Sequence, residues 1–386
     1  MTGLQATIRR EISRLCGRRL YFWTMIIVPV VCSLFFLSFL NEGLPLKSPS
    51  AIVDLDHSSM SRQAARSLQA MELVDIREKA NSFHEAMAMV ERGEIYGFFY
   101  IPEGFQKDAI SGRTPTLAYY SDMAYFVPGT LSFKGFKTLA VTTSGSIVKT
   151  ELVSVGVENS TADAILQPMA VQDHPIGNPW TNYSVYLSNS FLPGLIELMV
   201  MLVTSFSICR EIKVGSSVEW LETAGGSIWT AVVGKLIPQA VIFSVVGIFV
   251  QSLMFGYLHF PLNGSVWAMM LAMVLMVIAS QWLAVLFCSV FVNLRMAVAS
   301  SSLTAILAFS IAAFSFPLTS MYGSIAVFGY ILPVRYYFLI YIDQALNGIP
   351  LFYSRWYFIA LLLFPLLCGA FLWHLKKVCL KPVYVP

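Results

Sequence analysis

Residues 236–294 read LIPQAVIFSVVGIFVQSLMFGYLHFPLNGSVWAMMLAMVLMVIASQWLAVLFCSVFVNL, 59 residues without one Asp, Glu, Lys or Arg. Residues 296–334 form a second uncharged stretch, of 39 residues. A helix crosses a bilayer with about 20 apolar residues, so the first stretch must hold two spans. The turn signal HFPLNGS at 259–265 divides them. These stretches identify a polytopic α-helical membrane protein.

The composition agrees with this class. The chain has 386 residues, of which 56% are hydrophobic and 12% charged, the latter about half the usual share of a soluble domain. A water-soluble enzyme is therefore excluded, and the net charge of +3 gives no indication of nucleic acid as a partner. The six cysteines lie in or beside apolar segments without metal-ligand spacing, so we expect no metal site.

Six spans are predicted along the chain. The first, an uncleaved anchor, covers 21–40, and the second covers 186–208. The region 235–320 holds the third to fifth spans, near 236–257, 266–290 and 297–319, and the sixth covers 355–375. Residues 321–354 are too interrupted by Pro and Gly for a clean span, and we expect a re-entrant segment or loop there.

Residues 1–20 are predicted to form a basic amphipathic helix in the membrane interface. Leu4, Ile8, Ile12 and Leu15 share one helical face, and arginines surround it. A frayed chain end is the alternative interpretation.

Residues 41–185 are expected to form a mixed α/β domain between the first two spans. Strands are predicted at 51–55, 73–76, 95–101 and 116–120, helices at 59–71 and 82–91, and one or two helices over 129–166. A loop or edge strand is predicted over 168–179.

The charge distribution predicts the orientation. Basic residues cluster before the first span and after the last, and an even number of spans puts both ends on one side. The positive-inside rule makes that side cytoplasmic, together with the loop 209–234 and the tail 376–386. The domain 41–185 and the segment 321–354 then lie outside the cytoplasm.

Glu197 is the one acidic residue placed inside a predicted span, four residues after Pro193. A charge at membrane depth costs about 2.5–3.5 kcal/mol on insertion scales, so such residues are often functional. We consider a carboxylate in the translocation path. The structural alternative is a protonated or hydrogen-bonded glutamate with Ser188, Ser190 or another helix as its partner.

Asp54, Asp56 and His57 follow the first strand of the domain. Metal binding or acid–base chemistry is conceivable there. Aspartates at the end of a strand followed by serines more commonly cap the next helix, which is the interpretation we favour.

The sequence contains no G-x-x-x-x-G-K-[ST] motif; Gly234-Lys235 is followed by Leu. A phosphate-binding loop needs those glycines so that its backbone amides can surround the phosphates. We therefore expect no catalysis and no cofactor in this chain. Any ATP hydrolysis, with its ATP and Mg, would belong to a partner subunit.

Three segments together resemble the ABC-2 type permease family, in its efflux-type branch. The first is IVDLD at 52–56 with Ser61-Arg62, the second GFFYIPEGF at 97–105, and the third REIKVGSSVEWL at 210–221 with Gly234-Lys235. The similarity covers essentially the whole chain. Ser216 and Ser217 stand where threonine is usual, and Ala224-Gly225 replaces a common Thr-Pro.

This resemblance implies the membrane subunit of a bacterial exporter. Its partners would be an ATP-binding-cassette ATPase, a second permease copy or a sister chain, membrane lipid and an optional periplasmic adaptor. A short cytoplasmic helix at 217–223 would transmit the motion of the ATPase, with Glu219 meeting basic groups and with Trp220 and Leu221 filling a pocket of the partner. The residues assigned to coupling are Arg210, Glu211, Gly215, Ser216, Ser217, Glu219, Trp220 and Leu221.

Two other functions compete with this one. A proton- or ion-coupled secondary transporter would use Glu197 as its carrier, although such carriers tend to have several acids and internal repeats. A membrane-anchored receptor would need a cytoplasmic output domain. Drugs, lipids, peptides and ions all remain open as substrates.

Overall fold

A computed structural model describes residues 3–41, 43, 47–71, 74–111, 113–166, 177–178, 182–312, 314 and 316–382. The chain divides into two compact units, each considered by itself below. The helical unit comprises Met1–Gly43 and His174–Pro386, and the α/β unit comprises Leu44–Asp173. The loop predicted over 168–179 falls almost entirely outside the described residues, as does the end of the predicted tail.

Six helical segments of the helical unit are long and apolar enough to cross a membrane, as predicted. They are Arg19–Phe39, Tyr183–Val214, Ile228–Tyr257, Val266–Val290, Leu294–Ile311 and Leu351–Leu380. A short helix, α1 (Leu4–Cys16), precedes the first of them.

Several of these segments combine more than one helical element. The first consists of α2 (Arg19–Phe22), the π-helical η1 (Trp23–Ile27) and α3 (Val28–Phe39). The third consists of α11 (Ile228–Gln251) and the π-helical η2 (Ser252–Tyr257), and the sixth of α16 (Leu351–Gly369) and α17 (Leu372–Leu380). The others are α9 (Tyr183–Val214), α12 (Val266–Val290) and α13 (Leu294–Ile311).

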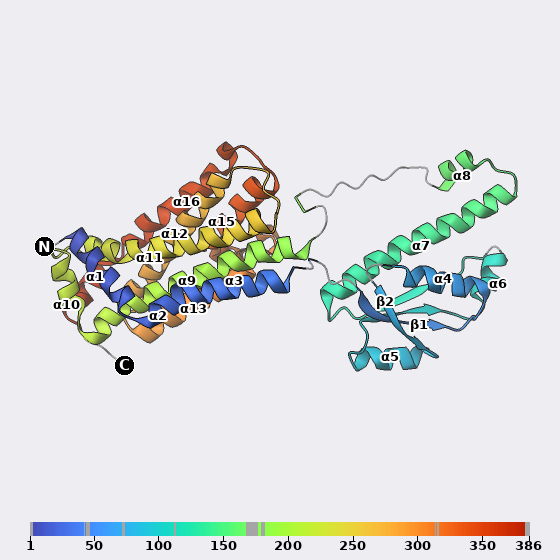
Figure 1. Cartoon of the computed structure of the whole chain (residues 1–386), viewed down its shortest axis with the longest axis horizontal. Helices are drawn as coiled ribbons and strands as arrows, with labels where there is room; N and C mark the ends of the chain where they lie inside the picture. Colours follow the sequence, from blue (N-terminus) through green and yellow to red (C-terminus); the bar gives the residue numbers. More distant parts are fainter. Residues whose placement is uncertain are drawn as a thin grey trace. The chain divides into compact units, whose positions relative to one another are not determined.

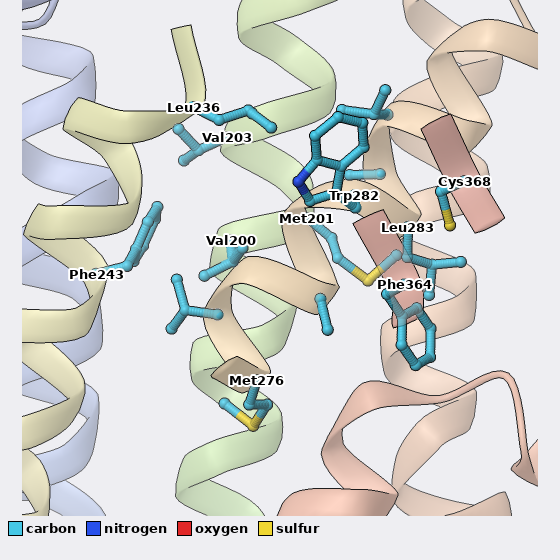
Figure 2. Packing of buried hydrophobic residues seen from close by; sticks show 14 of the residues in the cluster. Val200, Met201, Val203, Leu236, Phe243, Met276, Trp282, Leu283, Phe364 and Cys368 are labelled. Carbon is cyan, nitrogen blue, oxygen red and sulfur yellow. The ribbon is translucent and has the colours of Figure 1, made fainter. Parts of the chain in front are cut away.

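Helices α9 and α12 form the interior of the helical unit. Figure 2 shows side chains of α9, α11, α12 and α16 pointing toward one another, among them Val200, Phe243, Trp282 and Phe364. Large apolar side chains on the outer helices, such as Phe39 and Leu366, are exposed instead. This distribution suits a bundle whose solvent is lipid, because burial inside it is driven by packing and not by water.

Two glycines allow close helix approach inside this bundle. A Cβ atom at Gly194 of α9 would lie 2.6 Å from a ring carbon of Phe309 in α13. One at Gly247 of α11 would lie 2.6 Å from the Cγ of Met273 in α12. Small residues at such crossings bring helices together where there is little hydrophobic drive between them.

Some span ends differ from the prediction. Helix α9 continues to Val214 instead of ending at 208, so Arg210 and Glu211 belong to its last turns and not to a loop. Helix α17 continues to Leu380, so Lys376 and Lys377 are helical and not part of a tail. The prediction ended each span at its first charges, whereas both helices continue past them.

The segment 321–354 contains two helices. Helix α14 (Gly323–Gly329) is followed by α15 (Pro333–Tyr341), which continues through the π-helical η4 (Ile342–Leu346), and the axes differ by 82°. By length and composition the pair is either a broken span or a re-entrant loop. Pro333 sits in the first turn of α15, where a missing N–H is tolerated.

The α/β unit is built on a four-stranded sheet of order β2-β1-β3-β4. Strands β1 (Ser48–Asp54), β2 (Val74–Ala80) and β3 (Gly97–Ile101) are parallel, and β4 (Ala118–Ser121) is antiparallel to β3. Its helices are α4 (Ser59–Gln69), α5 (Phe83–Glu91), α6 (Phe105–Ile110), α7 (Phe126–Ser154) and α8 (Asn159–Leu166). The predicted strands and helices are thus confirmed, and α6 is an addition.

Helices cover both faces of this sheet (Figure 1). Val53 and Phe98 pack with Met89 of α5 on one face, and Ile52 and Phe99 pack on the other in a cluster with Leu68 of α4. Successive strand residues point to opposite faces, so both faces of β1 and β3 are apolar. The uninterrupted apolar run of β3 follows from this double coverage.

Candidate functional site

The predicted coupling helix is present as α10, with the bounds Ser217–Thr223. Gly215 ends α9 at φ 78°, and Gly225 and Gly226 follow α10 at φ 73° and 78°. A left-handed backbone of this kind favours glycine, because a side chain would clash with the backbone. These three glycines therefore set α10 apart as a separate short helix between α9 and α11.

Trp220 and Leu221 correct one prediction. They do not project toward a partner, because their side chains are 0% and 2% exposed and lie in the core of this chain. The indole Nε1 of Trp220 donates a hydrogen bond to the carbonyl of Ala231 at 3.2 Å, and Ser217 Oγ donates to the carbonyl of Cys379 at 2.9 Å. Helix α10 is therefore attached to α11 and α17.

The outward side of α10 is acidic. Glu219 has a side chain 71% exposed, and Glu222 is also exposed. The carboxylate of Glu219 lies 3.6 Å from the Nε of Arg10. This side of α10 is the part of the coupling segment that a partner protein can contact.

A buried carboxylate joins α10 to the rest of the helical unit. Glu211, in the last turn of α9, is fully buried and accepts a 2.5 Å hydrogen bond from Ser216 Oγ at the start of α10. Its carboxylate also lies 2.8 Å from Nη1 of Arg10, 2.9 Å from Nζ of Lys235, and against the guanidinium of Arg14. The predicted coupling residue Glu211 is thus an internal anchor.

A second buried carboxylate continues the network. Glu11 of α1 is 2% exposed and lies 2.6 Å from Nζ of Lys235, which is 1% exposed. Gln239 of α11 donates to Glu11 at 2.8 Å and to Ser207 Oγ of α9 at 3.0 Å. Lys235 therefore bridges two carboxylates, and its Nζ also lies 5.3 Å from the ring centroid of Trp220.

Helix α1 is part of this assembly. Its buried residues are Thr7, Glu11 and Leu15, and a Cβ atom at Gly234 of α11 would lie 2.7 Å from that of Thr7. The backbone N–H of Gly3 donates to the carbonyl of Thr223 in α10 at 2.8 Å. The predicted helix exists, with Thr7, Glu11 and Leu15 facing the protein and with Leu4 and Ile12 of the apolar stripe exposed.

Hydropathy patterns gave no signal for this network. Glu11 and Lys235 are 224 residues apart in sequence, and either looks like an ordinary interfacial charge by itself. The structure, by contrast, shows the effect of the network on Arg14: burial is the main cause that lowers the pKa of its guanidinium, and the neighbouring charge of Arg10 lowers it further. One available signal was Gly234-Lys235 at the start of an otherwise uncharged helix.

A family model described as ABC-2 family transporter protein matches residues 19–374. The chain belongs to the ABC-2 transporter family. It is therefore a membrane component of this class of transporter, and the match includes both the bundle and the inserted α/β unit. No curated protein matches the chain significantly.

Arg210 takes no part in the buried network. Its guanidinium lies 5.7 Å from the ring centroid of Phe206, one turn earlier in α9. Of the residues assigned to coupling, the structure brings Glu211, Ser217, Trp220 and Leu221 into the interior, leaves Ser216 half-buried, and leaves Glu219 exposed.

Glu197 lies fully buried in α9, and Pro193 is buried one turn earlier. Neither carboxyl oxygen has a hydrogen-bond partner among the described residues, although the backbone N–H of Val334, in the first turn of α15, faces it. Ser190 donates to the carbonyl of Leu187 and does not bind Glu197, and the Ser188 hydroxyl is without a partner. The serine partners that we considered are therefore wrong.

The favoured interpretation of the Asp54 cluster is wrong in its detail: the aspartates hold the loop, and α4 is capped by Ser58, whose Oγ accepts a hydrogen bond from the amide of Ser61. Asp54 accepts from the backbone amides of Asp56 and His57 and from Ser61 Oγ. Asp56 accepts from the amides of Gly104 and Gln106, and hydrogen bonding, first from Ser58, lowers the pKa of Asp56. The part of the chain that the structure describes holds no group of three or more His, Cys, Asp or Glu residues suited to a metal ion.

Replacing Lys235 should destabilise the helical unit strongly. In the Lys235→Met variant Glu11 loses its cation and keeps only Gln239, and an uncompensated buried charge costs about 3–5 kcal/mol. We expect a clearly lower thermal unfolding midpoint of the purified protein in detergent. The double variant Glu11→Gln/Lys235→Met removes one charge of each sign and should recover part of the loss.

The matched control is Arg9→Met, which removes a charge from an exposed position of α1. It should leave the midpoint nearly unchanged. Equal midpoints for Lys235→Met and Arg9→Met would show that the buried network contributes nothing to stability.

Proposed function

We propose that this chain is the permease subunit of an ATP-binding-cassette exporter, which forms a translocation path in a dimer and is driven by a separate ATPase subunit. Family membership supports the transporter class. The observation that supports coupling is the attachment of α10 to α1, α9, α11 and α17 through buried bonds. ATP and Mg are assigned to the partner, and no cofactor to this chain.

The coupling follows from the stiffness of these attachments. Ser216 and Glu211 bind the start of α10, Gly3 of α1 binds its end, and Trp220 sits in the core. A displacement of α10 by the ATPase must therefore move α1 and the ends of α9 and α11 with it. Glu219 and Glu222 would meet basic groups of the ATPase, since both are exposed.

Charge reversal on the outer side of α10 should uncouple the complex. The Glu222→Arg variant alters an exposed residue outside the buried network, and Glu219→Arg additionally repels Arg10. A charge reversal at an interface costs from about 1 to several kcal/mol, so recovery of the partner ATPase in a pull-down should fall about tenfold or more. Permease abundance should stay near the wild-type level.

Glu91→Arg, at an exposed position of α5, is the control for charge alone. If the α10 variants retain the ATPase as well as Glu91→Arg does and transport at the wild-type rate, α10 is not the docking element.

The proposed location is the bacterial inner membrane, with the chain ends and α10 in the cytoplasm and the α/β unit outside. The basic residues of α1 support this orientation, as do six spans with the pair α14 and α15 taken as a re-entrant loop. Substrate would pass between two copies, along α9 and α13, and leave toward the α/β units. A periplasmic adaptor would receive it there.

Single-cysteine labelling tests this orientation. On a background with native cysteines replaced by alanine, Ser111→Cys should react in intact cells with a maleimide that cannot cross membranes. Glu222→Cys should react only after permeabilisation, since both positions are exposed in the structure. The reverse pattern would invert the topology.

Glu197 is proposed to tune substrate handling without supplying energy. Glu197→Gln keeps the volume and removes the proton site, so it should change substrate affinity or range while ATP-driven uptake into inverted vesicles varies little from pH 6 to 8. If the variant abolishes transport, and if a proton gradient alone drives the wild type, the chain is a secondary transporter instead.

A further inference from the structure

The α/β unit contains a cavity of about 430 Å³ between α4 and the strands β1 and β2. The wall of the cavity includes Asp54, the last residue of β1, and His57 in the loop that follows. It also includes Ala80 and Asn81 at the end of β2. The cavity is thus at the carboxyl ends of two adjacent parallel strands, which is where open α/β sheets commonly bind ligands. Its volume is within the range of small-molecule sites.

Three cations converge on this cavity. Arg62 and Arg66 are one helical turn apart on α4, and both line it. Lys79 of β2 is the register partner of Ile52 in β1, so its side chain is on the same face of the sheet as Ile52, the face covered by α4. The cations therefore come from both walls of the cavity.

Among the described residues, no carboxylate forms an ion pair with these cations. Asp54 is the only acid in the lining, and its two oxygens are already used by backbone amides and by Ser61. In the described part of the chain, Arg66 and Lys79 have neither an ion pair nor a side-chain hydrogen bond, whereas Arg92 of the same unit pairs with Glu94 at 2.7 Å.

The remaining lining supplies an apolar surface and an anchored loop. Ile52, Ile76, Ala65 and Ala80 contribute apolar contacts. In the loop after β1, His57 adopts φ 46°. The loop is held to α4 because the carbonyl of His57 accepts a 2.7 Å hydrogen bond from Arg62 Nη1. A compact apolar group fits beside the cations in such a site.

We propose that this cavity binds a small amphiphilic anion, whose phosphate or carboxylate contacts Arg66 and Lys79 and whose apolar part rests on Ile52 and Ile76. Arginine presents a planar fork that matches both anions, and lysine adds a point charge. A soluble phosphate ester and an anionic lipid headgroup carry the same chemistry. The site lies within the α/β unit and goes beyond the proposed coupling function.

Calorimetric titration of the full chain in a non-ionic detergent tests the site. Phenyl phosphate should bind, while phenol, which lacks the charge, should not. The double variant Arg66→Gln/Lys79→Gln should weaken phenyl phosphate binding at least tenfold. Raising the salt from 50 to 500 mM should weaken wild-type binding several-fold, because the attraction is between charges near the surface.

The control Arg92→Gln/Arg113→Gln removes the same charge from exposed positions of the same unit outside this cavity, and should bind like the wild type. The single variants Arg66→Gln and Lys79→Gln give the same test, each with a smaller loss, if the double variant does not fold. A parallel titration with dihexanoylphosphatidic acid distinguishes the two sources. Binding of this lipid alone, with the same dependence on Arg66 and Lys79, assigns the headgroup as ligand.

Absence of binding by both probes would overturn the proposal, as would equal weakening in the control. The ATPase is absent from these titrations, so their result is independent of whether α10 is a coupling element.

Discussion

The position of Lys235 between Glu11 and Glu211 is the constraint on which the end of the bundle around α1 and α10 depends. All three side chains are buried, and taking a charge out of water costs several kcal/mol even after relaxation. The arrangement is acceptable only because each charge has partners at hydrogen-bonding distance. Helices α1, α9 and α11 are held in register by this requirement, since moving one of them leaves a charge unpaired.

The same constraint explains why α10 is more than a surface loop. Ser216 is bound to Glu211, so the entry to α10 is joined directly to the buried charges. Trp220 then fills the space beside Lys235 and α11, at the cost of being unavailable to a partner. The outward side of α10 is acidic. Its inward side is attached to α9 and α11 by hydrogen bonds.

Much of the fold could be predicted from the sequence, because spans and strands are local properties. Uncharged stretches long enough to cross a bilayer located the six segments, and the short helix implied by the family resemblance has the bounds of α10. Alternating and continuous apolar runs located the strands of the α/β unit. These features depend on neighbouring residues and hardly on distant ones.

The site was less predictable because its partners are far apart in sequence. The pairing of Glu11 with Lys235 joins residues 224 positions apart, and no periodicity encodes it. Trp220 was misjudged for the same reason: an exposed and a buried tryptophan look alike in a seven-residue helix. The end of α9 was also misplaced. The first charges were assumed to end the helix, whereas α9 continues to Val214 and buries Glu211, which pairs with basic side chains.

Unpaired polar groups carry different meanings in the two units. Arg66 and Lys79 are exposed to water, so leaving them without partners costs little, and only their convergence on one cavity is informative. Glu197 is fully buried, and its carboxyl oxygens have no hydrogen-bond partner in the described part of the chain apart from the facing N–H of Val334, so a charge there is costly. Glu197 and Glu211 are on one helix, fourteen residues and roughly 21 Å apart at 1.5 Å per residue. A shift imposed on the paired end of α9 therefore reaches the unpaired carboxyl directly, and Pro193 just beyond it is where the helix loses a backbone hydrogen bond and can bend.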